Sequence, residues 1–259
     1  MTLEEQADSP ETLDILYRDD DLVAVHKPSG LLVHRSEIDR RETRFALQLV
    51  RDQLGQWVYP VHRLDRPTSG VLLLALNPEA ARALSVAFAD GMVKKTYLAV
   101  VRGIAPEEGL IDYPLVEEPD RISDRQASKD KGAQPAVTAF RRLAQVELPC
   151  PVGRYPSSRY SLVEAHPRTG RKHQLRRHFK HLFHPIIGDT KHGEGRHNRF
   201  FREEFDCQRL LLAAVEVEFP HPRTGQLIAV SAPLDTTFAG VVERLGWRTQ
   251  LPERWLPPG

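Results

Sequence analysis

The sequence predicts an α+β protein built on a mostly antiparallel or mixed sheet. Of its 259 residues, 41% are apolar, which is enough for a large core. The short apolar runs typical of strands outnumber the segments with helical periodicity, and the two kinds do not alternate regularly along the chain. Regular alternation is what a doubly wound nucleotide-binding fold requires, so the pattern excludes that fold.

Each predicted strand is a short apolar run bounded by polar or turn residues. These runs are residues 13–17, 22–26, 31–33, 71–76, 96–101, 136–146, 160–165 and 210–219. Each predicted helix combines apolar residues near a 3.6-residue spacing with a boundary signal. A helix over 43–54 ends at Gly55, a second starts at Asn77 and Pro78 and runs to Gly91, and a last one covers 235–245.

No repeat and no flexible linker divides the chain, so we expect one catalytic domain over 13–259 after an acidic tail over 1–12. Two polar loops, 117–135 and 149–159, are expected to close on a large ligand, although simple surface insertions are equally compatible with them. No apolar run approaches the ~20 residues that span a bilayer, and the N-terminus lacks a secretory signal. With only two distant cysteines, the expected location is the cytoplasm.

Charge is divided unevenly along the chain. Residues 1–21 carry eight carboxylates and one arginine, whereas residues 160–202 carry ten cationic side chains and three carboxylates. Clustered Lys and Arg side chains favour a polyanionic ligand, because they displace counterions when they neutralise phosphates. A solvated charged surface is the alternative.

A dense polar cluster, residues 62–70, precedes the buried run of the first half. Asp65 lies between Arg63 and Arg66, and nearby positive charge favours the ionised carboxylate that a nucleophile or general base requires. Extended backbone here would place Arg63 and Asp65 on one face, opposite His62. A structural ion pair at a strand end is the commoner alternative.

The strand that begins near Thr96 carries a tyrosine and two lysines. Alternation places Lys95 and Tyr97 on one face, opposite Thr96 and Leu98. A tyrosine beside a cation can stack on a nucleobase, and its hydroxyl can take part in proton transfer. A tyrosine that simply packs in the sheet is the alternative.

Residues 168–179 pass from a strand through a Thr-Gly turn into a helix. The spacing of Leu175, Phe179 and Leu182 predicts the buried face of this helix. A cationic row at a helix N-terminus suits phosphate, and one arginine could instead bind a buried carboxylate through two hydrogen bonds. The row is Lys172, Arg176 and Lys180.

Five histidines in the same region suggest a metal site at first sight. Their spacing lacks a companion acidic ligand in the helix, and the neighbouring cations would repel a metal ion. We therefore expect no metal here. The five are His173, His178, His181, His184 and His192.

Four motifs occur in a fixed order along the chain. They are His26-Lys27-Pro28-Ser29-Gly30-Leu31-Leu32-Val33-His34, the cluster 62–70, Lys95-Thr96-Tyr97, and the run 170–178 followed by 184–189. Each motif alone is a weak signal. Together they span roughly residues 13–245 and resemble the RluA-type pseudouridine synthases.

The resemblance implies a pseudouridine synthase fold, with helices flanking the sheet, a central catalytic cleft and no N-terminal S4 domain. It implies that Asp65 is the nucleophile that helps to detach uracil from its ribose before the base rejoins through C5. Arg176 would pair with Asp65, Tyr97 would stack on the flipped uracil, and Arg63 would fill the gap left in the RNA. The predicted RNA-binding residues are His62, Arg63, Arg66, Lys95, Arg171, Lys172, Arg177 and Lys180.

The implied reaction is an isomerisation, so we expect no cofactor, and a monomer is the expected state. Residues 129–138 and 153–173 further resemble a tRNA-modifying member of the family, which implies tRNA as the partner and its uridine 65 as the target. Ala213 stands where the family commonly has His, which puts in doubt only a supporting hydrogen bond.

Three alternatives remain open from the sequence. A ribosomal-RNA or dual-specificity synthase of the same family would carry the same motifs. A non-catalytic RNA-binding module would use the cations and leave the aspartate structural. An aspartate-dependent hydrolase would need a base and an oxyanion site, which the sequence does not offer.

Overall fold

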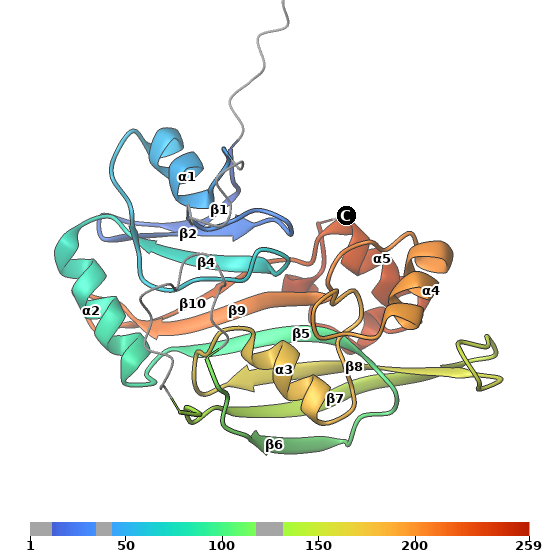
Figure 1. Ribbon diagram of the computed structural model, residues 1–259. Helices are drawn as coiled ribbons and strands as arrows, with labels where there is room; N and C mark the ends of the chain where they lie inside the picture. The colour runs from blue at the N-terminus through green and yellow to red at the C-terminus, as the bar shows by residue number, and fades with distance from the viewer. Residues whose placement is uncertain (1–11, 35–42, 118–131, 259) are drawn as a thin grey trace, which may run out of the picture.

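A computed structural model describes residues 12–34, 43–117 and 132–258, and a mostly antiparallel sheet forms its centre (Figure 1). The strands are β1 (Ile15–Arg18), β2 (Leu22–Lys27), β3 (Tyr59–Pro60), β4 (Ser69–Ala75), β5 (Lys94–Arg102), β6 (Glu108–Asp112), β7 (Val137–Leu148), β8 (Ser158–Pro167), β9 (Leu212–Pro220) and β10 (Leu227–Ser231). Their order is β1-β2-β4-β9-β5-β8-β7-β6, with β10 beside β9 and β3 beside β4. The α+β class is therefore confirmed.

Helices cover both faces of the sheet (Figure 1). Those in the described residues are α1 (Ala46–Leu54), α2 (Pro78–Ala89), α3 (Gln174–His181), α4 (Gly195–Phe205) and α5 (Thr236–Arg244), with short 3-10 turns η1 (Arg248–Gln250) and η2 (Glu253–Trp255). The predicted end of α1 at left-handed Gly55 is confirmed, although the helix begins at Ala46 and not at residue 43. The predicted start of α2 is confirmed, where Asn77 accepts a hydrogen bond from the backbone of Ala80. None of these helices is long and apolar enough to cross a membrane.

The sequence did not predict several elements, because few of their side chains are buried. Only two side chains of the polar helix α4 are buried, and the strands β6 and β10 each bury a single residue. The expected strand over 31–33 was wrong, because only Leu32 forms a bridge there, to Phe45. The loop predicted over 149–159 is mostly the tip of the β7–β8 hairpin. The tail over 1–12 lies outside the described residues except residue 12, as does the loop over 117–135 except its ends.

The core forms on both faces of the sheet because alternate residues of each strand point to opposite sides. In the β2–β4 half, one face packs against α2 and the other against α1. In the β5–β8–β9 half, one face packs against α4 and α5, and the other against α3. This arrangement places the start of α3 beside the centre of the sheet.

The two halves of the sheet meet at a short parallel contact between β4 and β9. Only Ser69 with Ala213 and Gly70 with Ala214 are paired there. Gly70 has a φ of 114°, and a Cβ on it would lie 2.0 Å from the carbonyl oxygen of Ala214. The glycine therefore lets the two strands approach closely, and it is the last residue of the polar cluster 62–70.

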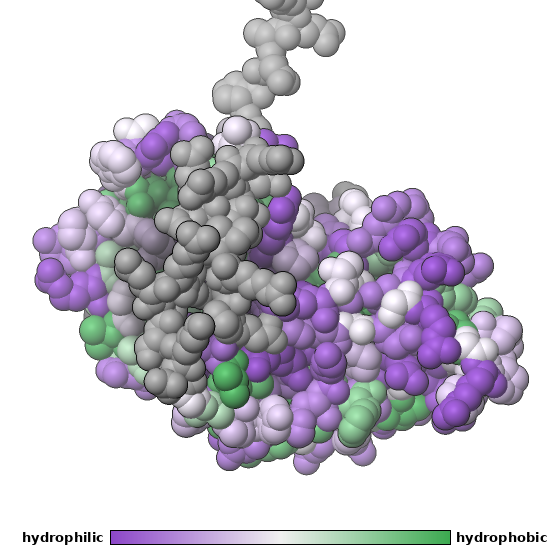
Figure 2. Space-filling view, viewed as in Figure 1, coloured by the Kyte–Doolittle hydropathy of each residue, from purple (hydrophilic) through white to green (hydrophobic). Residues whose placement is uncertain are grey.

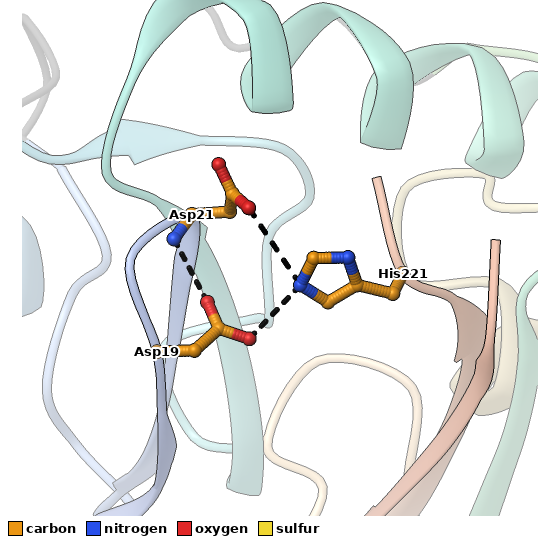
Figure 3. A group of neighbouring side chains, drawn as sticks. All are labelled: Asp19, Asp21 and His221. Carbon is orange, nitrogen blue, oxygen red and sulfur yellow. Dashed lines mark hydrogen bonds and ion pairs between the residues drawn. The ribbon is translucent and has the colours of Figure 1, made fainter. Parts of the chain in front are cut away.

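The turns at one end of the sheet are fastened by a histidine (Figure 3). Nε2 of His221 lies 3.0 Å from Asp19 Oδ2 and 3.7 Å from Asp21 Oδ2. The backbone N–H groups of Arg223 and Thr224 donate to Nδ1, so Nε2 carries the proton and faces the carboxylates as a donor. The side chain of Arg223 also pairs with Asp21. Although the three groups are close enough to surround a cation, the histidine offers it no free ligand nitrogen.

Candidate active site

A cavity of about 500 Å³ opens where the loop before β4, the start of β5 and the N-terminus of α3 meet. This volume suits a nucleotide-sized ligand. The cavity brings together side chains from three of the four sequence motifs. The predicted site residues that line it are His62, Arg63, Asp65, Lys95, Tyr97, Arg171, Lys172 and Arg176.

The loop that carries Asp65 is held by a buried lysine of the remaining motif. Lys27 donates from Nζ to the carbonyl oxygens of Pro28, Leu31 and Arg66 at 2.7–3.1 Å. Burial lowers the pKa of Lys27 to about 7, and the three carbonyl acceptors match the three donors of its charged form. The first motif therefore supports the Asp65 loop and does not itself line the cavity.

Arg176 joins two carboxylates beneath the cavity. Its Nε and Nη2 donate to the two oxygens of Asp189 at 2.7 and 2.9 Å, and its Nη1 donates to Oδ2 of Asp65 at 3.2 Å. The side chains of Arg176 and Asp189 are 5% and 1% exposed, whereas that of Asp65 is 19% exposed. Asp189 thus orients the guanidinium, and Asp65 is the carboxylate that reaches the open side.

The paired charges of Arg176 and Asp189 shift each other's ionisation. Burial favours the neutral forms, but the shared hydrogen bonds outweigh it, so the pKa of Arg176 is raised and that of Asp189 is lowered. Asp189 also accepts backbone N–H bonds from Lys191 and His192. Sequence reasoning included Asp189 in a motif but gave it no role, because its partner is defined only by the folded chain.

His173 is a second group beside Asp65. Its Nε2 lies 4.0 Å from Asp65 Oδ2, and its Nδ1 shares a hydrogen bond of 2.9 Å with Nε2 of His192. Burial lowers the pKa of His173 to about 4, so its imidazole is neutral at pH 7. Arg176 and His173 both face Oδ2, and Oδ1 of Asp65 has no hydrogen-bond partner among the described residues. That oxygen is available to a ligand.

Tyr97 and Lys95 lie on the wall of the cavity that β5 provides, as alternation predicted. Burial, reinforced by the charge of Asp65, raises the pKa of Tyr97, so its hydroxyl stays protonated at neutral pH. Lys95 donates to the carbonyl oxygen of Thr169 at 3.3 Å, and burial lowers the pKa of Lys95. The tyrosine can therefore offer an aromatic face and a hydrogen-bond donor to a bound base.

Arg63 and His62 are neighbours with different surroundings. Arg63 is exposed at the rim and forms no hydrogen bond or ion pair within the part of the chain that the structure describes. His62 stacks on Phe88, and its Nε2 accepts a hydrogen bond of 2.9 Å from the backbone N–H of Leu73. Its ring therefore anchors this loop to β4, a contact that sequence reasoning did not foresee.

Gln174 shapes the turn that leads into α3, and sequence reasoning missed it. Its Oε1 accepts hydrogen bonds from the Thr169 hydroxyl and the Arg171 backbone, and its Nε2 donates to the Val137 carbonyl and the Thr138 hydroxyl. The amide thus ties the turn to β7. The available signal was an amide side chain directly after Lys172-His173, at the point where the turn meets the predicted helix.

The cationic row expected on α3 was wrong, and the alternative, an arginine that binds a buried carboxylate through two hydrogen bonds, is confirmed by Arg176 and Asp189. Arg176 is buried between two carboxylates, and Lys180 lies exposed near the far end of the helix, so the two do not share a phosphate-binding surface. Three predicted RNA-binding residues do not line the cavity: Arg66 donates to the Gly30 carbonyl, Arg177 donates to the Val116 carbonyl, and Lys180 is on the outer surface.

Ala213, which stands where the family commonly has His, does not line the cavity. Ala213 packs in the apolar cluster on the α4 and α5 side of the sheet, whereas its neighbour Leu212 lines the cavity. A buried arginine, Arg209, instead donates to the Ser69 hydroxyl and the Leu212 carbonyl and pairs with Asp235. Polar support beneath the β4–β9 junction thus comes from Arg209.

A model of the RNA pseudouridylate synthase family matches residues 21–181, which is more than half of the chain. The match includes the Asp65 loop, Tyr97 and α3. It ends before Asp189.

Three curated relatives carry the name tRNA pseudouridine synthase C. The relative from Pectobacterium carotovorum subsp. carotovorum is 57% identical over 241 residues, which are 93% of this chain and 64% of that protein. The relative from Vibrio cholerae serotype O1 is 54% identical over 92% of this chain and 98% of its own length. The relative from Salmonella typhi is 55% identical, and the match covers 93% of each.

Two solved human structures share the fold. Human RNA Pseudouridylate Synthase Domain Containing 1 superposes with a TM-score of 0.66 at 27% identity, over 89% of this chain and 86% of that one. Human RNA Pseudouridylate Synthase Domain Containing 4 gives a TM-score of 0.67 at 26% identity, over 90% and 93%. The sheet and its flanking helices are thus those of solved pseudouridylate synthase domains.

Proposed function

The chain belongs to the RluA family of RNA pseudouridylate synthases, and from this premise we propose that it isomerises a uridine of tRNA to pseudouridine. The observation that carries the proposal is the meeting of Asp65, Arg176 and Tyr97 in one nucleotide-sized cavity. The relatives named tRNA pseudouridine synthase C favour tRNA as the RNA, and the target proposed is the uridine at tRNA position 65.

Asp65 supplies the nucleophilic oxygen in this proposal. The C1′–N1 bond of the uridine breaks, the uracil turns, a C1′–C5 bond forms, and the proton on C5 leaves while N1 gains one. Because Arg176 and His173 both lie on the Oδ2 side, Oδ1 is the oxygen that meets the nucleotide. Arg176 neutralises the carboxylate's charge in a partly buried site and orients it.

Tyr97 and Arg63 hold the extruded nucleotide and its neighbours. The Tyr97 ring stacks on the uracil, and its protonated hydroxyl can donate to a carbonyl of the base. Arg63 enters the RNA where the uridine has left, which offsets part of the few kcal/mol that extrusion costs. Support for this role is that no described residue pairs with its guanidinium.

The remaining features of the proposal follow from the reaction. An isomerisation consumes no electrons and no phosphoryl group, so the chain's own residues suffice without a cofactor or metal ion. We propose a monomer that acts in the cytoplasm, where tRNA matures. A ribosomal-RNA substrate is the second candidate within the family, since the same motifs would serve it.

The test is pseudouridine formation in unmodified tRNA. Wild-type protein is expected to produce reverse-transcription stops at alkali-resistant carbodiimide adducts of pseudouridine, and Asp65→Asn is expected to abolish them while tRNA binding persists. Asp52→Asn, an exposed carboxylate of α1, is the matched control and should retain activity. Activity in the Asp65 variant would refute the nucleophile, and binding without any wild-type activity on tRNA or ribosomal RNA would favour a binding module.

Mapping the modified position separates the substrates. RNA from cells that lack this protein should have lost one pseudouridine in tRNA. Loss from ribosomal RNA alone would contradict the tRNA assignment and would leave the reaction type intact.

A further inference from the structure

Phe183 is the most exposed large apolar side chain among the described residues. Its relative exposure is 85%, and it follows the last turn of α3 by two residues. Its ring has no aromatic or cationic partner within the described part of the chain. Nothing in the fold therefore explains why an aromatic ring stands here.

The backbone makes this position unusual as well. The N–H of Phe183 donates to the carbonyl of Lys180, and the N–H of His184 donates to the carbonyl of Phe179. This is the pair of bonds that closes a helix through a left-handed residue, which is usually glycine. Phe183 adopts that conformation with a φ of 61°. The side chain thus occupies a site where it costs conformational energy and gains no packing.

The backbone at Phe183 is held by its neighbours. Nδ1 of His184 donates a hydrogen bond of 2.8 Å to the carbonyl oxygen of Arg102. On the other side, Leu182 continues the apolar cluster beneath α3. Because both flanking residues are held, the backbone at Phe183 is held as well, and the side chain lies at the surface.

The surroundings of Phe183 suit an anionic, aromatic ligand. Lys180 is exposed in the same turn, and the exposed ring of His181 stacks on Tyr113 with a centroid distance of 3.7 Å. Figure 2 shows mainly hydrophilic residues on the face where α3 lies in Figure 1. An isolated aromatic ring beside a lysine on a polar surface matches a nucleobase above a phosphate better than it matches an apolar protein partner.

Helix α3 also sets the distance from this ring to the cavity. Its first residues line the cavity, and its eight residues rise by about 12 Å. Stacked nucleotides advance by roughly 3.4 Å each, so a strand that followed the axis of α3 would bring a base to Phe183 about three or four nucleotides from the extruded uridine.

We propose that Phe183 is a stacking platform for an unpaired base of the RNA substrate, outside the catalytic cavity. The inference rests on the proposed function, because it takes RNA as the ligand. Lys180 contacts the adjoining phosphate. The platform adds to RNA binding and takes no part in the chemical step.

The test compares variants of Phe183 in binding and turnover of unmodified tRNA. Phe183→Ala and Phe183→Gly are expected to raise both Kd and KM by about 5- to 100-fold, which corresponds to one lost base stack, with kcat unchanged. Phe183→Trp should restore binding. Trp57→Ala is the matched control, because Trp57 is 72% exposed beside Arg51 and lies on no proposed RNA path.

Two further measurements keep the outcome clear. Glycine suits the left-handed backbone, so Phe183→Gly should melt no earlier than wild type, and a loss of binding cannot then reflect misfolding. Base stacking does not depend on salt, so Phe183→Ala should leave unchanged the slope of log binding constant against log salt concentration. Lys180→Gln should reduce that slope by roughly the amount expected for one phosphate contact.

Unchanged Kd in both Phe183 variants, or a fall in kcat alone, would overturn the platform. Binding is measured without turnover, so the two proposals fail separately. If the enzyme is active and its Phe183 variants bind tRNA normally, only the platform proposal is refuted. If the protein is inactive on tRNA but binds it through Phe183, only the proposed reaction is refuted.

Discussion

Replacing Asp189 by Asn tests whether the buried guanidinium of Arg176 depends on its second carboxylate. Asn keeps an oxygen for the backbone N–H groups of Lys191 and His192, but its amide nitrogen then faces Nε of Arg176, donor against donor. One charge-assisted hydrogen bond is lost and a buried cation is left with Asp65 alone. Breaking such a pair costs about 3–5 kcal/mol, so we expect the free energy of unfolding to fall by about 3 kcal/mol.

The same change should slow the reaction. Without the hydrogen bond from its Nε to residue 189, the guanidinium of Arg176 turns toward Asp65 and shifts the carboxylate from its position. A displacement on the order of 1 Å can cost about 100-fold in rate, so kcat should fall by about that factor while tRNA binding changes little.

The assay combines denaturant unfolding, followed by the fluorescence of the buried Trp247 and Trp255, with single-turnover pseudouridine formation. Glu218→Gln, which breaks only the exposed pair with Lys94, is the control and should change stability by less than about 1 kcal/mol. If Asp189→Asn behaves like that control in stability and rate, the orienting role of Asp189 is wrong.

The dependence on pH gives an independent check of Asp189. Burial raises its pKa, but the hydrogen bonds from Arg176 and two backbone amides outweigh this and bring it below the ordinary 3.8. Its stabilising contribution is therefore complete above about pH 4 and is lost as the pH falls through the folded-state pKa. The difference in free energy of unfolding between wild type and Asp189→Asn should therefore be largest at neutral pH and should become smaller in acid.

Three further outcomes are expected. Lys27→Met should lower the free energy of unfolding by about 2–4 kcal/mol in urea titrations, because three carbonyl oxygens lose their donor. A change below about 1 kcal/mol would contradict the role of Lys27 in supporting the Asp65 loop. Burial lowers the pKa of His62 to about 4, so as the pH falls the unfolded chain binds this proton before the folded chain does. The free energy of unfolding should therefore fall by up to about 3 kcal/mol from pH 6.5 to pH 4, and His62→Gln should flatten this slope. An unchanged slope would refute the burial of a neutral His62. Gly70→Ala should lower the free energy of unfolding by more than about 3 kcal/mol in thermal melts, because its Cβ would collide with a carbonyl. Gly240→Ala, in an open helical position, should raise the free energy of unfolding by about 0.5–1 kcal/mol. Equal effects would show that the close strand contact is not needed.

Local signals in the sequence were sufficient for the class of fold and for several boundaries. Apolar alternation predicted most strands, and Gly55 and Asn77 marked the ends of two helices, because capping and turn formation depend on residues a few positions apart. The same local alternation placed Lys95 and Tyr97 on one face of β5. Elements that bury one or two side chains, such as β6 and α4, leave no such periodic signal.

Only the tertiary structure decided how the candidate site is supported. Arg176 reaches Asp65 across 111 positions of sequence and Asp189 across 13, so its place between two carboxylates has no periodic signature. The helical spacing left a surface row and a bond to a buried carboxylate both open, and only the family resemblance named Asp65 as a partner. Lys27 likewise reaches the Asp65 loop through the carbonyl oxygen of Arg66, 39 positions away, and no residue pattern predicts that contact. Composition and spacing determine which side chains a local segment exposes or buries. Which distant charges then meet is decided by the packing of the sheet halves and α3, because a buried charge is stable only where the fold brings it a partner.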